Sequence, residues 1–177
     1  LYDMVEELLD FSRMQNGLTL ECEKLDLAAE VSDAVLTMTP RAMQEGLTLR
    51  WEEPEAPVPV HADAARLKQV FINVLDNAVK YSPPGGTITV ELLQDGHNAF
   101  LNFTDEGRGI APEDLENVKT KFYKGKGAVR GSGIGLAVVD EIVTAHGGSL
   151  NLQSEVGRGT TVTVRLPLEA PKAHSAE

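Results

Sequence analysis

The chain has 177 residues, an apolar fraction of 42% and a net charge of −11 at pH 7. This length fits one domain that buries a core without cross-links, and the acidic balance argues against nucleic-acid binding. A single cysteine, Cys22, excludes an internal disulfide framework, and no cluster of cysteine and histidine predicts a zinc site. Neither a membrane-spanning run nor a signal peptide is recognisable, so we expect a soluble cytoplasmic domain in a reducing compartment.

Four helices are predicted from apolar residues that recur at helical spacing. The first ends at Asn16-Gly17, and the second contains Pro40, a residue that can kink a helix. Asp63 is a good N-cap for the third helix. The expected ranges are 1–15, 27–44, 63–82 and 135–145.

The runs between these helices are strand-like, and turn residues separate them. Two hairpins are expected, one around Asp95-Gly96 and one around Val156-Gly157. Hairpin strands with helices grouped between them predict an α+β fold, a two-layer α/β sandwich. The expected strands are 18–25, 47–52, a short one near 60, 87–93, 99–104, 149–154 and 160–166.

The third helix has a polar face that its stability alone does not explain. Asn73 and Asn77 lie one turn apart, and Gln69 and Lys80 continue the same face. Each Asn in a helix interior costs up to about 0.7 kcal/mol relative to Ala, so a merely solvated face would more cheaply use Glu, Lys or Gln. Two amide oxygens followed by Lys80 and Tyr81 can hold a hydrated Mg²⁺ ion and the phosphates that it carries.

Glycine-rich stretches elsewhere match neither of the two commonest nucleotide-binding motifs. A P-loop sequence is absent, and the stretch GSGIGL at 131–136 has its third glycine one residue too early for a Rossmann fingerprint. At DEGRG, 105–109, Asp105 could accept a hydrogen bond from an exocyclic amine, while the glycines let a base approach the backbone. A plain tight turn is the alternative explanation of this stretch.

A basic, glycine-rich segment precedes the last helix. Residues 119–130 contain five cations and no acid. Since the whole chain has a net charge of −11, the residues outside this segment carry about −16 together. A solvated loop is the ordinary explanation of such a run. Cations on a flexible backbone beside a helix N-terminus favour a lid that closes over phosphates.

In combination, order and spacing, these stretches resemble the catalytic ATP-binding domain of sensor histidine kinases. That domain belongs to the wider Bergerat-fold ATPases, and the similarity covers about residues 1–168. The resemblance implies a Bergerat-type fold, ATP and Mg²⁺ as ligands, and transfer of the γ-phosphoryl group to a histidine. It matches NVLDNAVKYS (73–82) to the N box, DEGRG to the first glycine box, FYK (122–124) to the F box, GSGIGL to the second glycine box, and GRGT (157–160) to the segment beside the adenine.

The same resemblance assigns roles to individual residues. Asn77 takes the magnesium-coordinating position, Asp105 recognises the adenine amine, and the lid and helix N-terminus at 135 neutralise phosphate charge. The nucleotide-binding residues that it implies are Asn73, Asn77, Lys80, Tyr81, Asp105, Gly107, Gly109, Ile110, Phe122, Lys124, Arg130, Gly131, Ser132, Gly133, Ile134, Gly135, Leu136 and Thr160.

One position separates the branches of the wider family. The hydrolysing members and the anti-sigma-type serine kinases have a Glu where this chain has Asn73, and an amide is not a base at pH 7. Losing a general base typically costs a rate factor of about 10²–10⁴, so we expect slow ATP hydrolysis. A non-catalytic nucleotide-sensing module and an anti-sigma-type serine/threonine kinase are the two alternatives.

The chain also departs from the family pattern. Residues 1–15 resemble the end of the second helix of a dimerisation hairpin, 16–168 the catalytic domain, and 169–177 a disordered tail. None of the four histidines has the phosphoacceptor context, and Lys119 replaces the usual first Phe of the F box. We therefore expect part of a longer, homodimeric receptor anchored in the bacterial inner membrane, with its own dimerisation domain and a response regulator as partners. This piece alone is expected to be a monomer.

Overall fold

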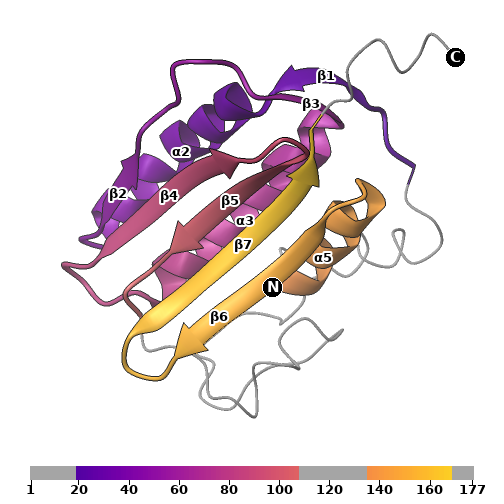
Figure 1. Ribbon diagram of the computed structural model, residues 1–177. Coiled ribbons are helices and arrows are strands. Elements are labelled where there is room, and N and C mark those ends of the chain that lie inside the picture. Colours follow the sequence, from indigo (N-terminus) through magenta and orange to yellow (C-terminus); the bar gives the residue numbers. More distant parts are fainter. Residues whose placement is uncertain (1–18, 108–134, 169–177) are drawn as a thin grey trace, which may run out of the picture.

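The computed structural model describes residues 19–107 and 135–168. Its main sheet has five strands in the order β2-β4-β5-β7-β6, and the helices α2, α3 and α5 lie together on one face of it (Figure 1). This is the predicted α+β two-layer sandwich. The helices are α2 (Leu27–Gln44), α3 (Ala64–Tyr81) and α5 (Gly135–Ala145), and the main-sheet strands are β2 (Thr48–Trp51), β4 (Thr87–Gln94), β5 (Asn98–Thr104), β6 (Ser149–Glu155) and β7 (Gly159–Pro167).

The main sheet is antiparallel except at one edge. β4–β5 and β6–β7 are the two predicted hairpins, and β5 pairs with β7, which places Thr104 opposite Thr161. At the edge, β2 runs parallel to β4, with Thr48 opposite Thr87. That parallel pair needs a long crossover, which α3 supplies.

A second, two-stranded sheet joins β1 (Glu23–Asp26) to β3 (Pro59–Ala62). The predicted strand 18–25 was too long, since the strand observed is β1. Its partner β3 has only four residues before α3 begins, so no more than four residues of β1 can pair with it. Ahead of β1, the N–H of Glu21 donates instead to Asp63 Oδ2 at 2.9 Å. The incoming chain is thus tied directly to the residue that begins α3.

Asp63 is the N-cap of α3, as predicted. Its Oδ1 accepts a hydrogen bond from Arg66 N–H at 3.2 Å. The N–H of Asp63 donates to Nε2 of His146, just after the end of α5, at 3.1 Å. Since Nε2 is the acceptor, the other ring nitrogen carries the proton and donates to the carbonyl of Ile142, 2.8 Å away.

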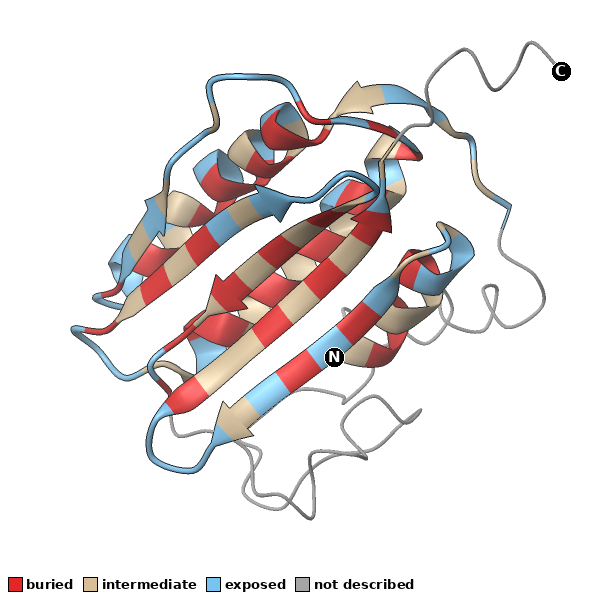
Figure 2. Cartoon of the chain, viewed as in Figure 1, coloured by how far each residue is buried: buried red, intermediate tan, exposed pale blue. Residues whose placement is uncertain are grey.

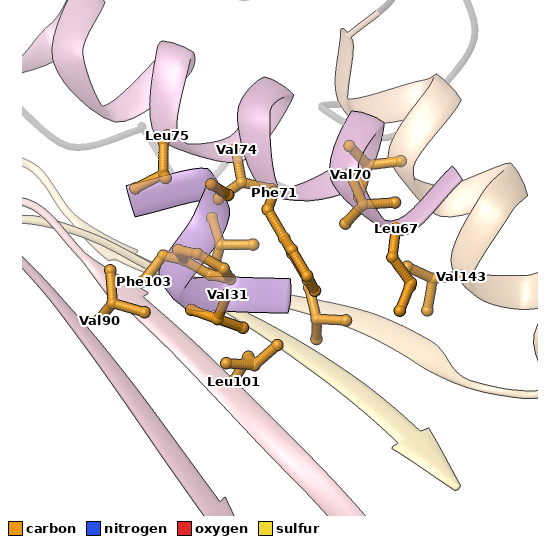
Figure 3. Packing of buried hydrophobic residues seen from close by; sticks show 14 of the residues in the cluster. Val31, Leu67, Val70, Phe71, Val74, Leu75, Val90, Leu101, Phe103 and Val143 are labelled. Atoms are coloured by element: carbon orange, nitrogen blue, oxygen red, sulfur yellow. The ribbon is translucent and has the colours of Figure 1, made fainter. Parts of the chain in front are cut away.

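The core lies between the helices and the sheet. Buried and half-exposed residues alternate along β5 and β7, as a strand with one covered face requires (Figure 2). Phe71 of α3 and Phe103 of β5 pack with ring centroids 6.2 Å apart at the centre of the cluster in Figure 3. This packing fixes α3 against the strand that ends at Asp105.

Three predicted parts of the chain lie outside the described residues: the helix 1–15, the basic segment 119–130 and the tail 169–177. The predicted domain boundaries at 15 and 168 therefore stay predictions. In the described ranges, no helix has the length and apolar character needed to cross a membrane.

Candidate functional site

Asp105, Gly107 and Thr160 meet where β5 and β7 end. The N–H groups of Gly107 and Thr160 both donate to Asp105 Oδ1, at 2.8 and 3.2 Å, and Asp105 N–H donates to Thr160 O at 2.9 Å. Residues 55 positions apart in the chain are thereby locked together. The side chain of Asp105 has one fixed orientation as a result.

The second carboxylate oxygen of Asp105 has no hydrogen-bond donor among the described residues. Asp105 as a whole is only 9% exposed. In the described ranges, Ser82 Oγ is the single side-chain polar atom that is completely covered and lacks a partner, and Asp105 Oδ2 is not among such atoms. A buried, oriented acceptor of this kind suits one amine donor from a ligand.

Burial raises the pKa of the Asp105 carboxyl, and the hydrogen bonds from Gly107 and Thr160 oppose that rise. The charged form is disfavoured because it leaves water for an apolar surrounding. A donor supplied by a ligand at Oδ2 would therefore stabilise a carboxylate that has little solvation of its own.

Gly107 allows the end of β5 to approach the end of α3. A Cβ on Gly107 would lie 2.4 Å from the carbonyl oxygen of Tyr81, closer than atoms pack. This contact places Asp105 near the last turn of α3, and Asn77 lies one turn before Tyr81. The sequence predicted a glycine there for ligand approach, and the structure shows an additional reason for it within the fold.

α3 and α5 run in opposite directions. The start of α3 is bonded to the end of α5 through Asp63 and His146, and Leu67 lies beside Val143 one turn further on (Figure 3). At about 1.5 Å per residue, the eleven residues of α5 reach back roughly 16 Å along α3, to about Asn73 or Val74. Gly135 and Leu136, at the N-terminus of α5, therefore lie beside the Asn-bearing part of α3.

Asn73 and Asn77 are half-buried on α3. Within the described ranges neither side-chain amide makes a hydrogen bond. No group of three or more His, Cys, Asp or Glu residues in those ranges could hold a metal ion. A carboxamide oxygen such as Asn77 Oδ1 is a ligand type that Mg²⁺ accepts, and Mg²⁺ needs only one or two of them from protein.

Lys80 has a carboxylate partner in the structure. Its Nζ lies 3.2 Å from Oδ2 of Asp76, one turn earlier on α3. Oδ1 of the same carboxylate contacts the guanidinium of Arg41 on α2. Sequence reasoning missed Asp76 and Arg41, because an acid inside a motif and a base in another helix carry no local signal of their contact.

The structure thus brings together two groups of predicted site residues. Asp105, Gly107 and Thr160 form one, and Asn73, Asn77, Lys80 and Tyr81 on α3, with Gly135 and Leu136, form the other. The remaining predicted residues lie outside the described ranges. These are Gly109, Ile110, Phe122, Lys124, Arg130, Gly131, Ser132, Gly133 and Ile134.

A two-layer sandwich with these elements and this strand order is a Bergerat-type fold. A family model described as histidine kinase-, DNA gyrase B-, and HSP90-like ATPase matches residues 62–170. The chain belongs to this family.

Individual proteins with this fold are similar over nearly the whole chain. The histidine protein kinase DivJ of Caulobacter vibrioides is 34% identical over 174 residues, which cover 95% of this chain and 29% of DivJ. The solved structure of the mycobacterial sensor histidine kinase MprB has a TM-score of 0.72 and 32% identity, over 85% of this chain and 99% of that one.

A third similar protein was solved with a nucleotide analogue. The structure of full-length ShkA in complex with AMPPNP has a TM-score of 0.81 and 26% identity, over 96% of this chain and 36% of that one. The chain spans 21% to 44% of the length of the first curated relatives that it matches. It has the fold and the family of a catalytic, ATP-binding domain of the histidine kinase type.

Proposed function

We propose that this domain binds ATP with Mg²⁺ and transfers the γ-phosphoryl group to a histidine on its own dimerisation domain. The group would then pass to an aspartate of a response regulator. The observation that carries the proposal is the pairing of an oriented, buried acceptor at Asp105 with the N-terminus of α5 beside the Asn-bearing part of α3. Histidine kinases among the similar proteins support the same reaction.

The adenine end of the site is assigned to Asp105. Its Oδ1 is already occupied by two backbone N–H groups, so Oδ2 takes the exocyclic amine of the base. Gly107 keeps the strand end free of side-chain bulk, and the backbone of Thr160 holds the carboxylate in place. Such an acceptor favours adenine over a base that presents a carbonyl at the same position.

The phosphate end is assigned to α3 and α5. Asn77 Oδ1 would hold Mg²⁺, which shields the charge of the triphosphate, and Asn73 would orient the water around it. The positive end of the α5 dipole at Gly135 and Leu136 attracts the phosphates, and Lys80 and Tyr81 contribute a cation and a hydroxyl. The cations and glycines of the segment 119–130 are proposed to close over this end.

Asn73 directs the chemistry towards an external acceptor. An amide at this position cannot remove a proton from an attacking water or serine hydroxyl. The nucleophile must therefore be one whose attacking atom carries no proton to remove, and the unprotonated nitrogen of a neutral imidazole is such an atom. The remaining contribution of the domain is positioning and charge stabilisation, which is what phosphoryl transfer chiefly needs.

The partners and place of the whole protein follow from the same proposal. We propose a homodimer that joins through the dimerisation domain, with a response regulator as the downstream acceptor. The catalytic domain would work in the cytoplasm, attached to a protein anchored in the bacterial inner membrane. Nucleic acid is not a proposed partner, since the net charge is −11.

The test mixes this chain with a separately produced acceptor hairpin of the same protein and γ-labelled ATP. We expect an acid-labile, alkali-stable label on the hairpin, no label on the chain itself, and no transfer by Asn77→Ala. Rapid hydrolysis without the hairpin would instead indicate an ATPase. An acid-stable phosphoserine would indicate the serine kinase type, and binding without transfer a nucleotide-sensing module.

A further inference from the structure

Asp76 is shared by two cations from two helices. Arg41 of α2 contacts Oδ1, and Lys80 of α3 lies 3.2 Å from Oδ2. The three side chains are partly exposed, at 41% for Arg41, 27% for Asp76 and 34% for Lys80. The carboxylate therefore bridges α2 to the very residue that is assigned to the phosphates.

The bridge bears on the nucleotide because of where Asp76 stands on α3. Asp76 directly precedes Asn77, and Lys80 follows one turn later, on the flank that carries both asparagines. Asp76 and a phosphate would compete for the single positive charge of Lys80. Binding would therefore draw Lys80 away from its 3.2 Å contact with Asp76.

The cost of breaking that contact depends on what remains beside the carboxylate. With Arg41 in place, Asp76 keeps a cationic partner after Lys80 has left. Without Arg41, Lys80 would be the one cation beside Asp76 among the described residues, and Asp76 would hold it more tightly.

We propose that Arg41 is a positioning residue for nucleotide binding: it neutralises Asp76 and so releases Lys80 to the phosphates. The inference rests on the proposed function, specifically on the phosphate role of Lys80. The proposal gives Arg41 no contact with the ligand. Its effect travels through one carboxylate.

The expected effect is modest, since partly exposed ion pairs contribute little. Arg41→Gln should weaken the binding of Mg-ATP about threefold, the size that an exposed pair supplies. Asp76→Asn should leave Lys80 without a competing partner and should bind at least as tightly as wild type. In the Asp76→Asn background, Arg41→Gln should have no further effect.

The experiment is a double-mutant cycle by calorimetry with Mg-ATP, on wild type, Arg41→Gln, Asp76→Asn and the double variant. Arg41→Lys should retain most of the wild-type affinity. The matched control is Lys68→Gln, because Lys68 of α3 pairs with Asp33 of α2 at 3.5 Å, across the same two helices but away from the asparagines. It should leave the affinity unchanged, and thermal unfolding of each variant shows that it is folded.

The outcomes separate the inference from the proposed function. An equal loss for Arg41→Gln with and without Asp76, or no loss at all, overturns the inference while the proposed function stands. Normal binding by Lys80→Gln removes the phosphate role of Lys80, and the inference with it. A wild-type chain that does not bind Mg-ATP overturns both.

Discussion

Gly159 lies against the backbone of Asp105, so that a Cβ at position 159 would be 2.2 Å from the Asp105 carbonyl oxygen. Gly159 also has a φ of +115°, a backbone conformation that residues with a side chain rarely adopt. The start of β7 can therefore lie against Asp105 only because this residue has no side chain.

Gly159→Ala should destabilise the domain by about 2 kcal/mol or more, because it combines backbone strain with a clash against the chain. It should also weaken nucleotide binding, since Thr160 can no longer hold Asp105. Thermal unfolding and calorimetry with ADP measure the two effects. Gly96→Ala is the control: nothing lies within 4 Å of its added Cβ, and a change within about 0.5 kcal/mol is expected. Equal effects at both glycines would contradict the close approach.

Asp105→Asn should lower the affinity for ADP by about tenfold or more without unfolding the domain. The new Oδ1 still accepts from Gly107 and Thr160, but the second atom becomes an NH₂ donor that faces the donor of the base. Asp95→Asn is a matched control, because Asp95 also accepts two backbone N–H bonds, at 2.7 Å each, in a hairpin remote from the site. Unchanged affinity in Asp105→Asn would exclude Oδ2 as the adenine acceptor.

The affinity for adenosine should fall on acidification, starting above the ordinary Asp value of 3.8, because burial raises the pKa of Asp105. The protonated carboxyl offers a hydroxyl donor in place of an acceptor. Adenosine is the ligand of choice, since it has no phosphate to titrate. The pH dependence should be absent from Asp105→Asn.

The raised pKa of Asp105 also predicts the sign of its effect on stability. A folded-state pKa above the unfolded one gives a stabilising contribution that is present at low pH and is lost as the pH rises through the folded value. At neutral pH the ionised Asp105 therefore opposes folding. Urea unfolding of Asp105→Asn at pH 7 should show a free energy of unfolding no lower than that of wild type, and a large decrease would contradict this account.

Asp63 should show the opposite pH dependence. Burial tends to raise its pKa, but the N–H groups of Glu21, Arg66 and Ala65 outweigh that and lower it. The ionised cap therefore stabilises the fold above the unfolded pKa, and this contribution is lost as the pH falls through the folded value. Asp63→Ala should cost about 1–2 kcal/mol at pH 7, and the difference from wild type should shrink at acid pH in urea unfolding. Asp33→Ala, at an exposed site, should cost within about 0.5 kcal/mol.

Asn77→Ala should remove most of the dependence of ADP binding on Mg²⁺, while the weaker binding of metal-free ADP remains. The amide oxygen is the proposed protein ligand of the ion, and alanine offers none. Titrations of ADP with and without Mg²⁺ measure the difference. A variant that keeps the wild-type Mg²⁺ enhancement would contradict the assignment.

Local rules predicted the elements well. The cap at Asp63, the turns at Asp95 and Gly157, and the alternation in β5 and β7 all depend on residues near one another in the chain. The strand at 18–25 was too long, because its extent is set by β3, about forty residues later.

The candidate site likewise has a part that the sequence predicts and a part that it does not. Asn73 and Asn77 were recognisable as a helix face, and Asp105 as a motif. The hydrogen bond from Thr160 to Asp105 and the ion pairs of Asp76 depend on how strands and helices are placed in space, which local patterns do not contain. Arg41 was missed for this reason: it looks like an ordinary cation in the last turn of α2.

The hydrogen bond from Glu21 N–H to Asp63 Oδ2 links the chain ahead of β1 directly to the first turn of α3. A force on that part of the chain reaches α3, the helix that carries both asparagines, through one side chain, that of Asp63. It also reaches the end of α5, because Asp63 is bonded to His146. The two helices to which we assign the phosphates are thus held at one common point, which lies at the far end of α3 from Tyr81. A displacement there would turn both about this point, and a small movement at the anchor would become a larger one at the opposite end of the helix pair.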